Sequence, residues 1–260
     1  MLDDAVTSHF ESVASQYDEV LPFFTSFARD ATPHIEFRPG ARVLDLGSGR
    51  GAISRVALAH GCHVTAVDSS PTMIRLLRQD MPAVEAAVMD AQHPDLDDAS
   101  FEVVVSAFVV HIVSDPQSLV ANAVRVLRPG GLVALVVPGR ADGAPDAWTD
   151  PVQDVVREFR AYQADGSGRH AGGDYESEEQ LLTDHGLIDV TGATLEVSLP
   201  VPDGDTYWRW MNSHGAGTFA KSLPEARRTE FKERVTRAVD QAGGTVLRRS
   251  AAVWSGTRPS

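Results

Sequence analysis

Several features are scarce in this 260-residue chain, and each scarcity excludes something. It has a single cysteine, Cys62, so an internal disulfide and a cysteine-based metal site are both excluded. No stretch gives the uninterrupted apolar run of about 18 residues that a membrane-spanning helix needs. The first residues carry neither the basic nor the apolar segment of a secretory signal. We therefore expect a cytoplasmic protein in a reducing environment.

Basic residues are also in short supply. The chain has 23 Lys and Arg against 36 Asp and Glu, a formal charge of −13 at pH 7. Nucleic-acid binding needs clustered positive charge, so this balance argues against it. The histidines show no metal-ligand spacing, and we expect no metal. The remaining expectation is a small-molecule substrate and a monomer or homodimer, without nucleic-acid or membrane partners.

The most informative stretch is residues 43–51, with the sequence VLDLGSGRG. A short apolar strand is followed by three alternating glycines, Gly47, Gly49 and Gly51, and then by a helical pattern. Glycine lets the backbone turn with positive φ or approach a ligand closely. A strand that leads through such a turn into a helix is typical of a nucleotide-cofactor site.

The rest of the pattern alternates strands and helices. Strands are expected at 42–46, 63–67, 84–89, 101–106 and 132–137, which predicts a parallel, doubly wound α/β sheet. Helix starts are expected at Ser70, Asp115 and a capping box at 177–180, and residues 128–131 read as a turn before the fifth strand. Further on, strands are expected at 188–201 and 245–257, with helices near 151–162, 205–213 and 224–241.

Two cofactors fit the glycine turn. Residues 47–52 match G-x-G-x-x-A, and Asp68 lies 19 residues past Gly49, as in a dinucleotide fingerprint. Asp45 favours S-adenosylmethionine (SAM) instead, because a carboxylate repels a pyrophosphate but attracts an ammonium and a sulfonium. Asp68 and Asp90 end the next two strands, where they can accept hydrogen bonds from the ribose hydroxyls and the adenine amino group. The chain after the fifth strand is also too short for a second mononucleotide half.

These motifs resemble the class I SAM-dependent methyltransferases over residues 40–138. The resemblance is carried by residues 43–51, 64–74, 90–92, 101–111 and 127–131. It implies a Rossmann-like sheet of seven strands whose last strand, about 245–257, is antiparallel. Residues 13–18 (VASQYD) also resemble the subgroup with ubiquinone and menaquinone C-methyltransferases, in which a tyrosine helix covers the cofactor.

The resulting prediction is a methyltransferase that moves the methyl group of SAM to an O, N or C nucleophile, leaving S-adenosylhomocysteine. A small hydrophobic or aromatic acceptor, such as a specialised metabolite, is expected. The expected parts are an N-terminal helical lid (1–39), a SAM-binding core (40–138), substrate-binding cap insertions (139–244) that include a core strand near 188–201, and a final strand (245–260). A SAM-retaining enzyme that does not methylate, such as a cyclase, an NAD(P)-dependent oxidoreductase and a binding or scaffold module remain as alternatives.

The candidate site residues fall into three groups. His111, which follows the fourth strand, and His214, in an aromatic stretch, are the candidate catalytic residues, with a general base as the candidate role of His111. The predicted cofactor-binding residues are Tyr17, Asp45, Gly47, Ser48, Gly49, Gly51, Asp68, Ser69, Met73, Asp90, Ala91, Gln92, Ser106 and Ala107. The predicted substrate-binding residues are Phe24, His111, Trp148, His170, Trp208, Met211 and His214.

Overall fold

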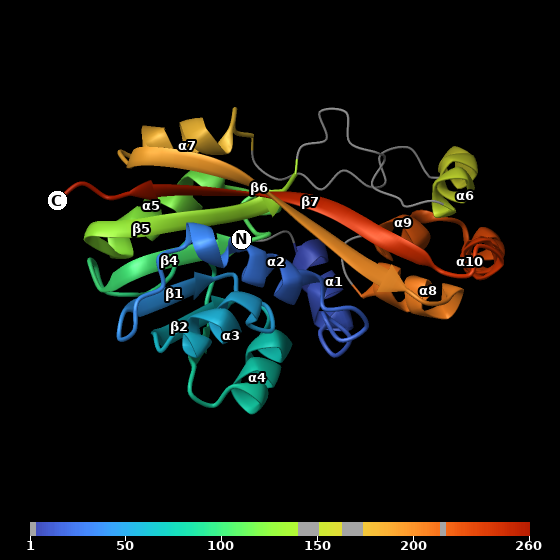
Figure 1. The fold of residues 1–260 in the computed structure, drawn as a ribbon, viewed down its shortest axis with the longest axis horizontal. Helices are drawn as coiled ribbons and strands as arrows, with labels where there is room; N and C mark the ends of the chain where they lie inside the picture. Colours follow the sequence, from blue (N-terminus) through green and yellow to red (C-terminus); the bar gives the residue numbers. More distant parts are fainter. Residues whose placement is uncertain (1–3, 140–150, 163–173, 214–216) are drawn as a thin grey trace.

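A seven-stranded sheet crosses the computed structural model, with strand order β3-β2-β1-β4-β5-β7-β6 (Figure 1). The structure describes residues 4–139, 151–162, 174–213 and 217–260. The strands are β1 (Arg42–Leu46), β2 (His63–Asp68), β3 (Glu85–Val88), β4 (Phe101–Ala107), β5 (Leu127–Pro138), β6 (Ile188–Val201) and β7 (Thr245–Thr257). The first five are parallel, and β7 lies antiparallel between β5 and β6. The predicted doubly wound sheet with an antiparallel last strand is confirmed.

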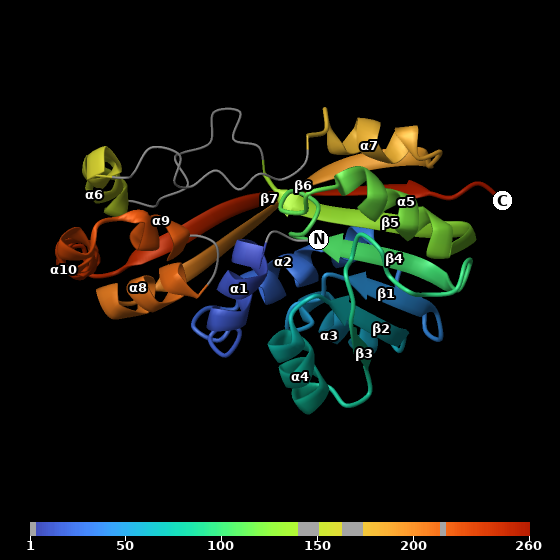
Figure 2. The same ribbon diagram turned by 180° about the vertical axis from the view of Figure 1, so that it is seen from behind.

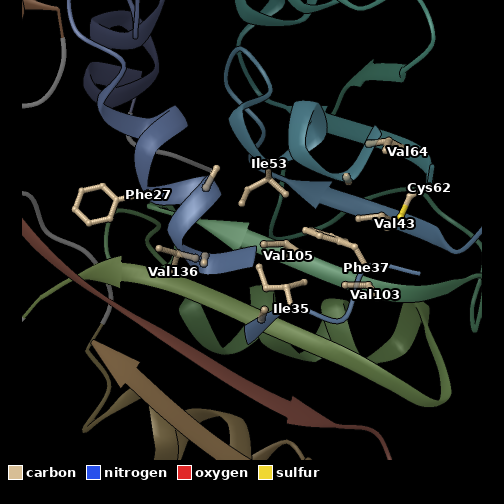
Figure 3. Close-up of a cluster of buried hydrophobic side chains, with 14 of the residues drawn as sticks. Phe27, Ile35, Phe37, Val43, Ile53, Cys62, Val64, Val103, Val105 and Val136 are labelled. Carbon is tan, nitrogen blue, oxygen red and sulfur yellow. The ribbon is translucent and has the colours of Figure 1, made fainter. Parts of the chain in front are cut away.

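Helices cover both faces of this sheet. They are α1 (Asp4–Val13), α2 (Phe23–Ala31), α3 (Ala52–Ala59), α4 (Pro71–Asp80), α5 (Pro116–Val126) and α7 (Glu178–Asp184), with a 3-10 turn η1 (Thr32–His34) after α2. One hydrophobic cluster joins α2, α3 and α4 to the sheet, with Phe27, Ile53 and Val105 among its buried residues (Figure 3). A second cluster packs α5 and α7 against the other face. β1 and β4 are therefore buried on both faces, as the apolar run Val103–Val105 of β4 requires.

Three helices begin at the caps that the sequence predicts. Ser70 accepts a hydrogen bond from the amide of the third residue of α4, at 3.1 Å, and Asp115 does the same for α5 at 2.9 Å. Ser177 accepts from the amide of Gln180 at 3.1 Å, but the Gln180 side chain donates to Asp184. The third cap therefore forms only the Ser177 half of the expected capping box.

Residues 128–131 correct one expectation. Instead of a turn before the fifth strand, they form an irregularity inside β5, which already begins at Leu127 opposite Phe101. The backbone stays bonded there because the amide of Gly130 donates to the carbonyl of Arg258 at 2.8 Å, and the amide of Arg258 donates to Gly131 at 2.9 Å. The partner, Arg258, lies more than 120 residues further along the chain. A local sequence pattern cannot predict such a contact.

The long antiparallel pair β6–β7 extends past the other strands of the sheet and carries a separate layer of helices, which we call the cap. β5 ends at Pro138 opposite Ala251, so the outer parts of β6 and β7 pair only with each other. Packed on them are α6 (Val152–Phe159), η2 (Arg160–Tyr162), α8 (Gly204–Asn212), α9 (Gly217–Ser222) and α10 (Glu225–Gln241) (Figure 2). Their buried side chains form a third hydrophobic cluster with Leu199 and Leu247. The short helix α9 was not predicted, and the expected domain boundaries stay a prediction.

Among the described residues, no helix is both long and apolar enough to cross a membrane. The same part of the chain holds no group of three or more His, Cys, Asp or Glu side chains that could bind a metal ion.

Candidate functional site

Two cavities open at the carboxyl ends of β1, β2 and β4, the edge at which doubly wound sheets bind ligands. The larger one holds about 760 Å³ of space and the smaller about 550 Å³, both partly open to solvent. They share five wall residues, which are Tyr17, Gly47, Gly49, Ala107 and Phe108. The glycine turn therefore forms the common wall of two adjoining spaces.

The turn is fixed by hydrogen bonds to the end of β2. The amides of Gly47 and Ser48 donate to the carbonyl of Val67 at 2.8 and 2.9 Å. Gly49 has φ +52°, which strains any residue with a side chain, whereas a Cβ there would make only ordinary contact with the ring of Tyr17, at 3.5 Å. Gly51 precedes α3 with φ +79°, a left-handed conformation that favours glycine, and a Cβ there would also meet the flexible end of Met81. Gly51 thus serves the backbone of the turn, and it lines neither cavity.

Asp45, at the end of β1, is buried beside the larger cavity. Its Oδ2 accepts hydrogen bonds from the amide and the hydroxyl of Ser54, at 3.0 and 2.6 Å. Since Ser54 is the third residue of α3 and Gly51 has no side chain, Asp45 supplies the cap that this helix lacks. Burial raises the pKa of Asp45 to about 6. Its Oδ1 makes no hydrogen bond to the described residues, which leaves a carboxylate oxygen for a cationic ligand.

Two further polar groups face the cavities. Asp68, at the end of β2, lines the smaller one and accepts hydrogen bonds from the amides of Gly49 and Ser70, both at 2.8 Å. Burial raises the pKa of this carboxyl. In the larger cavity, the hydroxyl of Ser48 is buried without a partner among the described residues. A buried polar atom without a partner costs about 1–3 kcal/mol, so the site favours a ligand that bonds to Ser48.

Tyr17, in the loop between α1 and α2, forms the other wall of both cavities. Its ring stacks on Phe24, with centroids 4.5 Å apart, and meets Phe10 edge-on at 6.0 Å. Burial raises the pKa of Tyr17 well above its usual range, so the hydroxyl keeps its proton. The loop is thus an aromatic cover over the glycine turn.

Phe108 is a wall residue that the sequence analysis missed. It follows β4, lines both cavities and has φ +59°, a strained conformation for a bulky side chain. Its ring packs against Phe24 and Phe27, both at 5.3 Å. Thr25 and Arg55, also missed, line the larger cavity. Nothing in the local sequence marks them, because the packing of α2 against α3 brings them to the wall.

The structure brings many of the predicted residues together, and it separates others from the cavities. The walls contain Tyr17, Phe24, Asp45, Gly47, Ser48, Gly49, Asp68, Ser69, Met73, Ala91 and Ala107. Gly51, Asp90, Gln92, Ser106, His111, Trp208 and Met211 lie outside both sets of wall residues. Trp148, His170 and His214 lie outside the described residues.

Some of the outlying side chains have other partners. The carbonyl oxygen of the Gln92 side chain accepts from the hydroxyl of Ser114 at 3.1 Å and the amide of Asp115 at 2.8 Å. The hydroxyl of buried Ser106 donates to the carbonyl of Leu46 at 3.0 Å. The bonds of Gln92 join the segments after β3 and β4, and the bond of Ser106 joins β4 to β1, which favours a structural role for both side chains.

His111 lies in the segment after β4, next to Ile112, which lines the smaller cavity. Trp208 and Met211 belong to the hydrophobic cluster of the cap. Asp90 accepts hydrogen bonds from the backbone and side chain of Gln92. The functional roles predicted for these residues stay predictions.

Comparison with known proteins agrees with this geometry. Residues 44–135 match the family model described as "Methyltransferase domain". A malonyl-[acyl-carrier protein] O-methyltransferase of Serratia marcescens is 32% identical over 55% of this chain and 57% of its own length. A demethylmenaquinone methyltransferase of Tropheryma whipplei is 33% identical over 47% of this chain and 54% of its own length. The chain thus spans a little over half the length of these curated relatives.

Among solved structures, a putative methyltransferase from Bacillus halodurans C-125 has the same fold. It superposes with a TM-score of 0.56 at 20% identity and covers 90% of this chain and 99% of its own.

Proposed function

We propose that this chain, a member of the class I SAM-dependent methyltransferases, transfers a methyl group from SAM to an O, N or C atom of a small acceptor. One observation carries the proposal, namely the buried carboxylate of Asp45, which lines the cavity at the glycine turn and has one oxygen without a hydrogen bond to the described residues. A dinucleotide would bring a negative pyrophosphate to this turn and be repelled. A ligand with an ammonium and a sulfonium is attracted.

The residues present fit SAM. In the smaller cavity, Asp68 would accept hydrogen bonds from the ribose hydroxyls, and Met73, Ala91 and Ile112 offer apolar surface to the base. In the larger cavity, Asp45 would hold the ammonium of the methionine part, and Ser48 would gain its missing partner. When bound, SAM supplies an activated methyl group on a sulfonium, and S-adenosylhomocysteine is left after transfer.

The protein's own part is then mainly to align the reactants and to exclude water. Tyr17, Phe24 and Phe108 form an aromatic layer at the glycine turn, and their rings would shield the bound reactants from solvent. Holding two reactants in reactive alignment lowers a barrier by about 7–11 kcal/mol. The strained backbone of Phe108 is consistent with a position set by this task.

A general base would help only where the acceptor carries a proton of high pKa, and His111 remains the candidate. A base typically contributes about 10²–10⁴-fold to the rate. If His111 has this role, His111→Gln lowers kcat by that factor and leaves the Kd for SAM unchanged. A loss of less than about tenfold would assign His111 to positioning or to structure.

For the acceptor, we propose a small hydrophobic or aromatic molecule. The support is the aromatic lining of the cavities, with Phe10, Phe24 and Phe108 around Tyr17. We also propose that residues 1–39 act as a lid and residues 139–244 as the substrate-binding cap. The predicted roles of Trp148, His170, Trp208, Met211 and His214 belong to this part of the proposal.

The test is a transfer assay with purified protein, SAM and a panel of phenols, catechols, aromatic amines and aromatic acids. Mass spectrometry would detect an acceptor that is heavier by one methyl group, together with an equal amount of S-adenosylhomocysteine. A product of unchanged mass without S-adenosylhomocysteine would contradict methyl transfer and indicate an enzyme that retains SAM. Oxidation or reduction of the acceptor with NAD(P)(H) would contradict the cofactor assignment.

A further inference from the structure

Arg50 joins the glycine turn to the loop that carries Tyr17. It lies between Gly49 and Gly51 in the turn, and its side chain is only 15% exposed. The guanidinium bonds to Glu19 at 2.6 Å and to Asp80, at the end of α4, at 2.5 Å. Both Glu19 and Arg50 line the larger cavity. One side chain therefore contacts the loop, the turn and a helix of the core.

Three carboxylates position the segment that contains Tyr17. Glu11 accepts from the hydroxyl of Ser70 at 2.7 Å and the amide of Thr72 at 3.1 Å, which ties α1 to the start of α4. Asp18 accepts from the amides of Phe24 and Thr25, at 2.7 and 2.9 Å, and so caps α2. The third carboxylate is that of Glu19, which forms the ion pair with Arg50.

These three contacts differ in what they hold. The Asp18 contact lies within the N-terminal segment, so it shapes the loop without tying it to the sheet. The Glu11 contact is with α4, on the side of Asp68. The contact between Glu19 and Arg50 links the Tyr17 loop directly to the turn that Tyr17 covers. Glu19 is 58% exposed, and a pair so exposed contributes little to global stability, so it can open without unfolding the core.

We propose that Arg50 is a positioning residue, which through Glu19 holds Tyr17 over the glycine turn and slows the release of the bound nucleoside. The proposal rests on the proposed function in naming SAM as that nucleoside. Arg50 provides the cation because it lies in the glycine turn, whose amides of Gly47 and Ser48 bond to β2, and because Asp80 binds the second guanidinium nitrogen. The Tyr17 loop then closes against a cation that is already in place.

The guanidinium has two carboxylate partners, and this gives a matched pair of variants. Glu19→Gln removes the ion pair with the loop, whereas Asp80→Asn removes the ion pair with α4 and leaves the one with the loop intact. We expect Glu19→Gln to speed SAM dissociation about two- to fivefold in stopped-flow measurements, as for the loss of one partly exposed ion pair. Asp80→Asn should change that rate less than half as much. Equal effects of the two variants, or no effect of Glu19→Gln, would overturn the proposal.

Hydrogen exchange of the protein without ligand separates this proposal from the proposed function. We expect faster exchange of the amides of residues 14–22 in Glu19→Gln than in the wild type or in Asp80→Asn. If the wild type binds no SAM but this difference is seen, the proposed function fails, and the role of Arg50 in holding the Tyr17 loop stands. If SAM binds normally and exchange in the loop is the same in all three proteins, the role proposed for Arg50 is wrong and the proposed function stands.

Discussion

At the glycine turn and in the cap, side chains are buried for different reasons. Around the turn, the buried set includes Asp45 and Ser48, polar groups that keep an atom for a ligand. In the cap, the cluster around Phe231 is formed by aliphatic and aromatic side chains that pack on one another. The turn thus holds polar groups in a costly environment, as a binding site requires. The cap holds itself together as a second hydrophobic core.

The comparison makes the two regions separable by mutation. Substitutions in the cap should lower the free energy of unfolding and leave SAM affinity nearly unchanged. Substitutions of the polar groups at the turn should lower the affinity for SAM. They should change the free energy of unfolding little, and some should increase it.

Phe231→Ala should produce the largest loss of stability. Phe231 is fully buried in the cap, and the centroid of its ring lies 5.1 Å from that of Phe159 and 5.3 Å from that of Phe219. Removing a buried phenylalanine ring costs about 3–5 kcal/mol of unfolding free energy. Urea denaturation would measure this cost, with the exposed neighbour Glu233→Ala as the control. A large loss of SAM affinity in the folded variant would break the separation of the two regions.

Asp45→Asn should make the protein more stable at pH 8 and poorer at binding SAM. Its folded-state pKa, about 6, lies above the usual value of 3.8, so the folded protein binds this proton more tightly than the unfolded chain does. The wild type therefore loses stability as pH rises from about 4 to 6 and does not regain it above that range. An asparagine oxygen still accepts hydrogen bonds from Ser54 and carries no charge. The variant's free energy of unfolding should therefore exceed that of the wild type by about 2–3 kcal/mol at pH 8 and be nearly equal to it at pH 4.

Thermal and urea unfolding of both proteins across this pH range would measure the difference. A variant that is less stable than the wild type at pH 8 would contradict this description of Asp45. SAM affinity of the wild type should also rise with pH through about 6, as the carboxyl of Asp45 loses its proton.

Asp68→Ala should weaken SAM binding by about ten- to hundredfold, the usual effect of losing hydrogen bonds to a charged group. Calorimetry would measure it, with Asp95→Ala, an exposed acid after β3, as the control. Some stability is lost as well, because the amides of Gly49 and Ser70 lose their acceptor. An unchanged affinity would contradict the role of Asp68 at the ribose.

Much of this arrangement could be predicted from the sequence, because it depends on local or periodic signals. The bounds of β6 and β7, the caps at Ser70 and Asp115, and the series of acids at the strand ends are of this kind. The left-handed backbone of Phe108 could not be predicted, since a glycine would signal it and a phenylalanine does not. The sequence also did not predict the wall positions of Thr25 and Arg55 or the ion pairs of Arg50, because these depend on elements that meet only in the folded chain.

The predicted base shows the same limit. His111 was chosen because it follows the fourth strand, and the structure confirms that place. Position along the chain does not say which way a side chain faces, and His111 is absent from the walls of both cavities. Its role therefore needs the kinetic test described above.

Ser48→Ala should have the smallest effect. Its buried hydroxyl has no partner among the described residues, so removing it should leave stability unchanged or slightly higher. Affinity for SAM should fall about two- to tenfold, as for the loss of one hydrogen bond. Calorimetry and urea denaturation of the same samples would check both. A marked loss of stability would mean that Ser48 serves the fold and not the ligand.

In the proposed function, the acids around the glycine turn select a cationic nucleoside. Isothermal titration of the wild-type protein with SAM and, separately, with NADH tests it most directly. We predict saturable binding of SAM at one site per chain and no binding of NADH. Binding of NADH without binding of SAM would contradict the account.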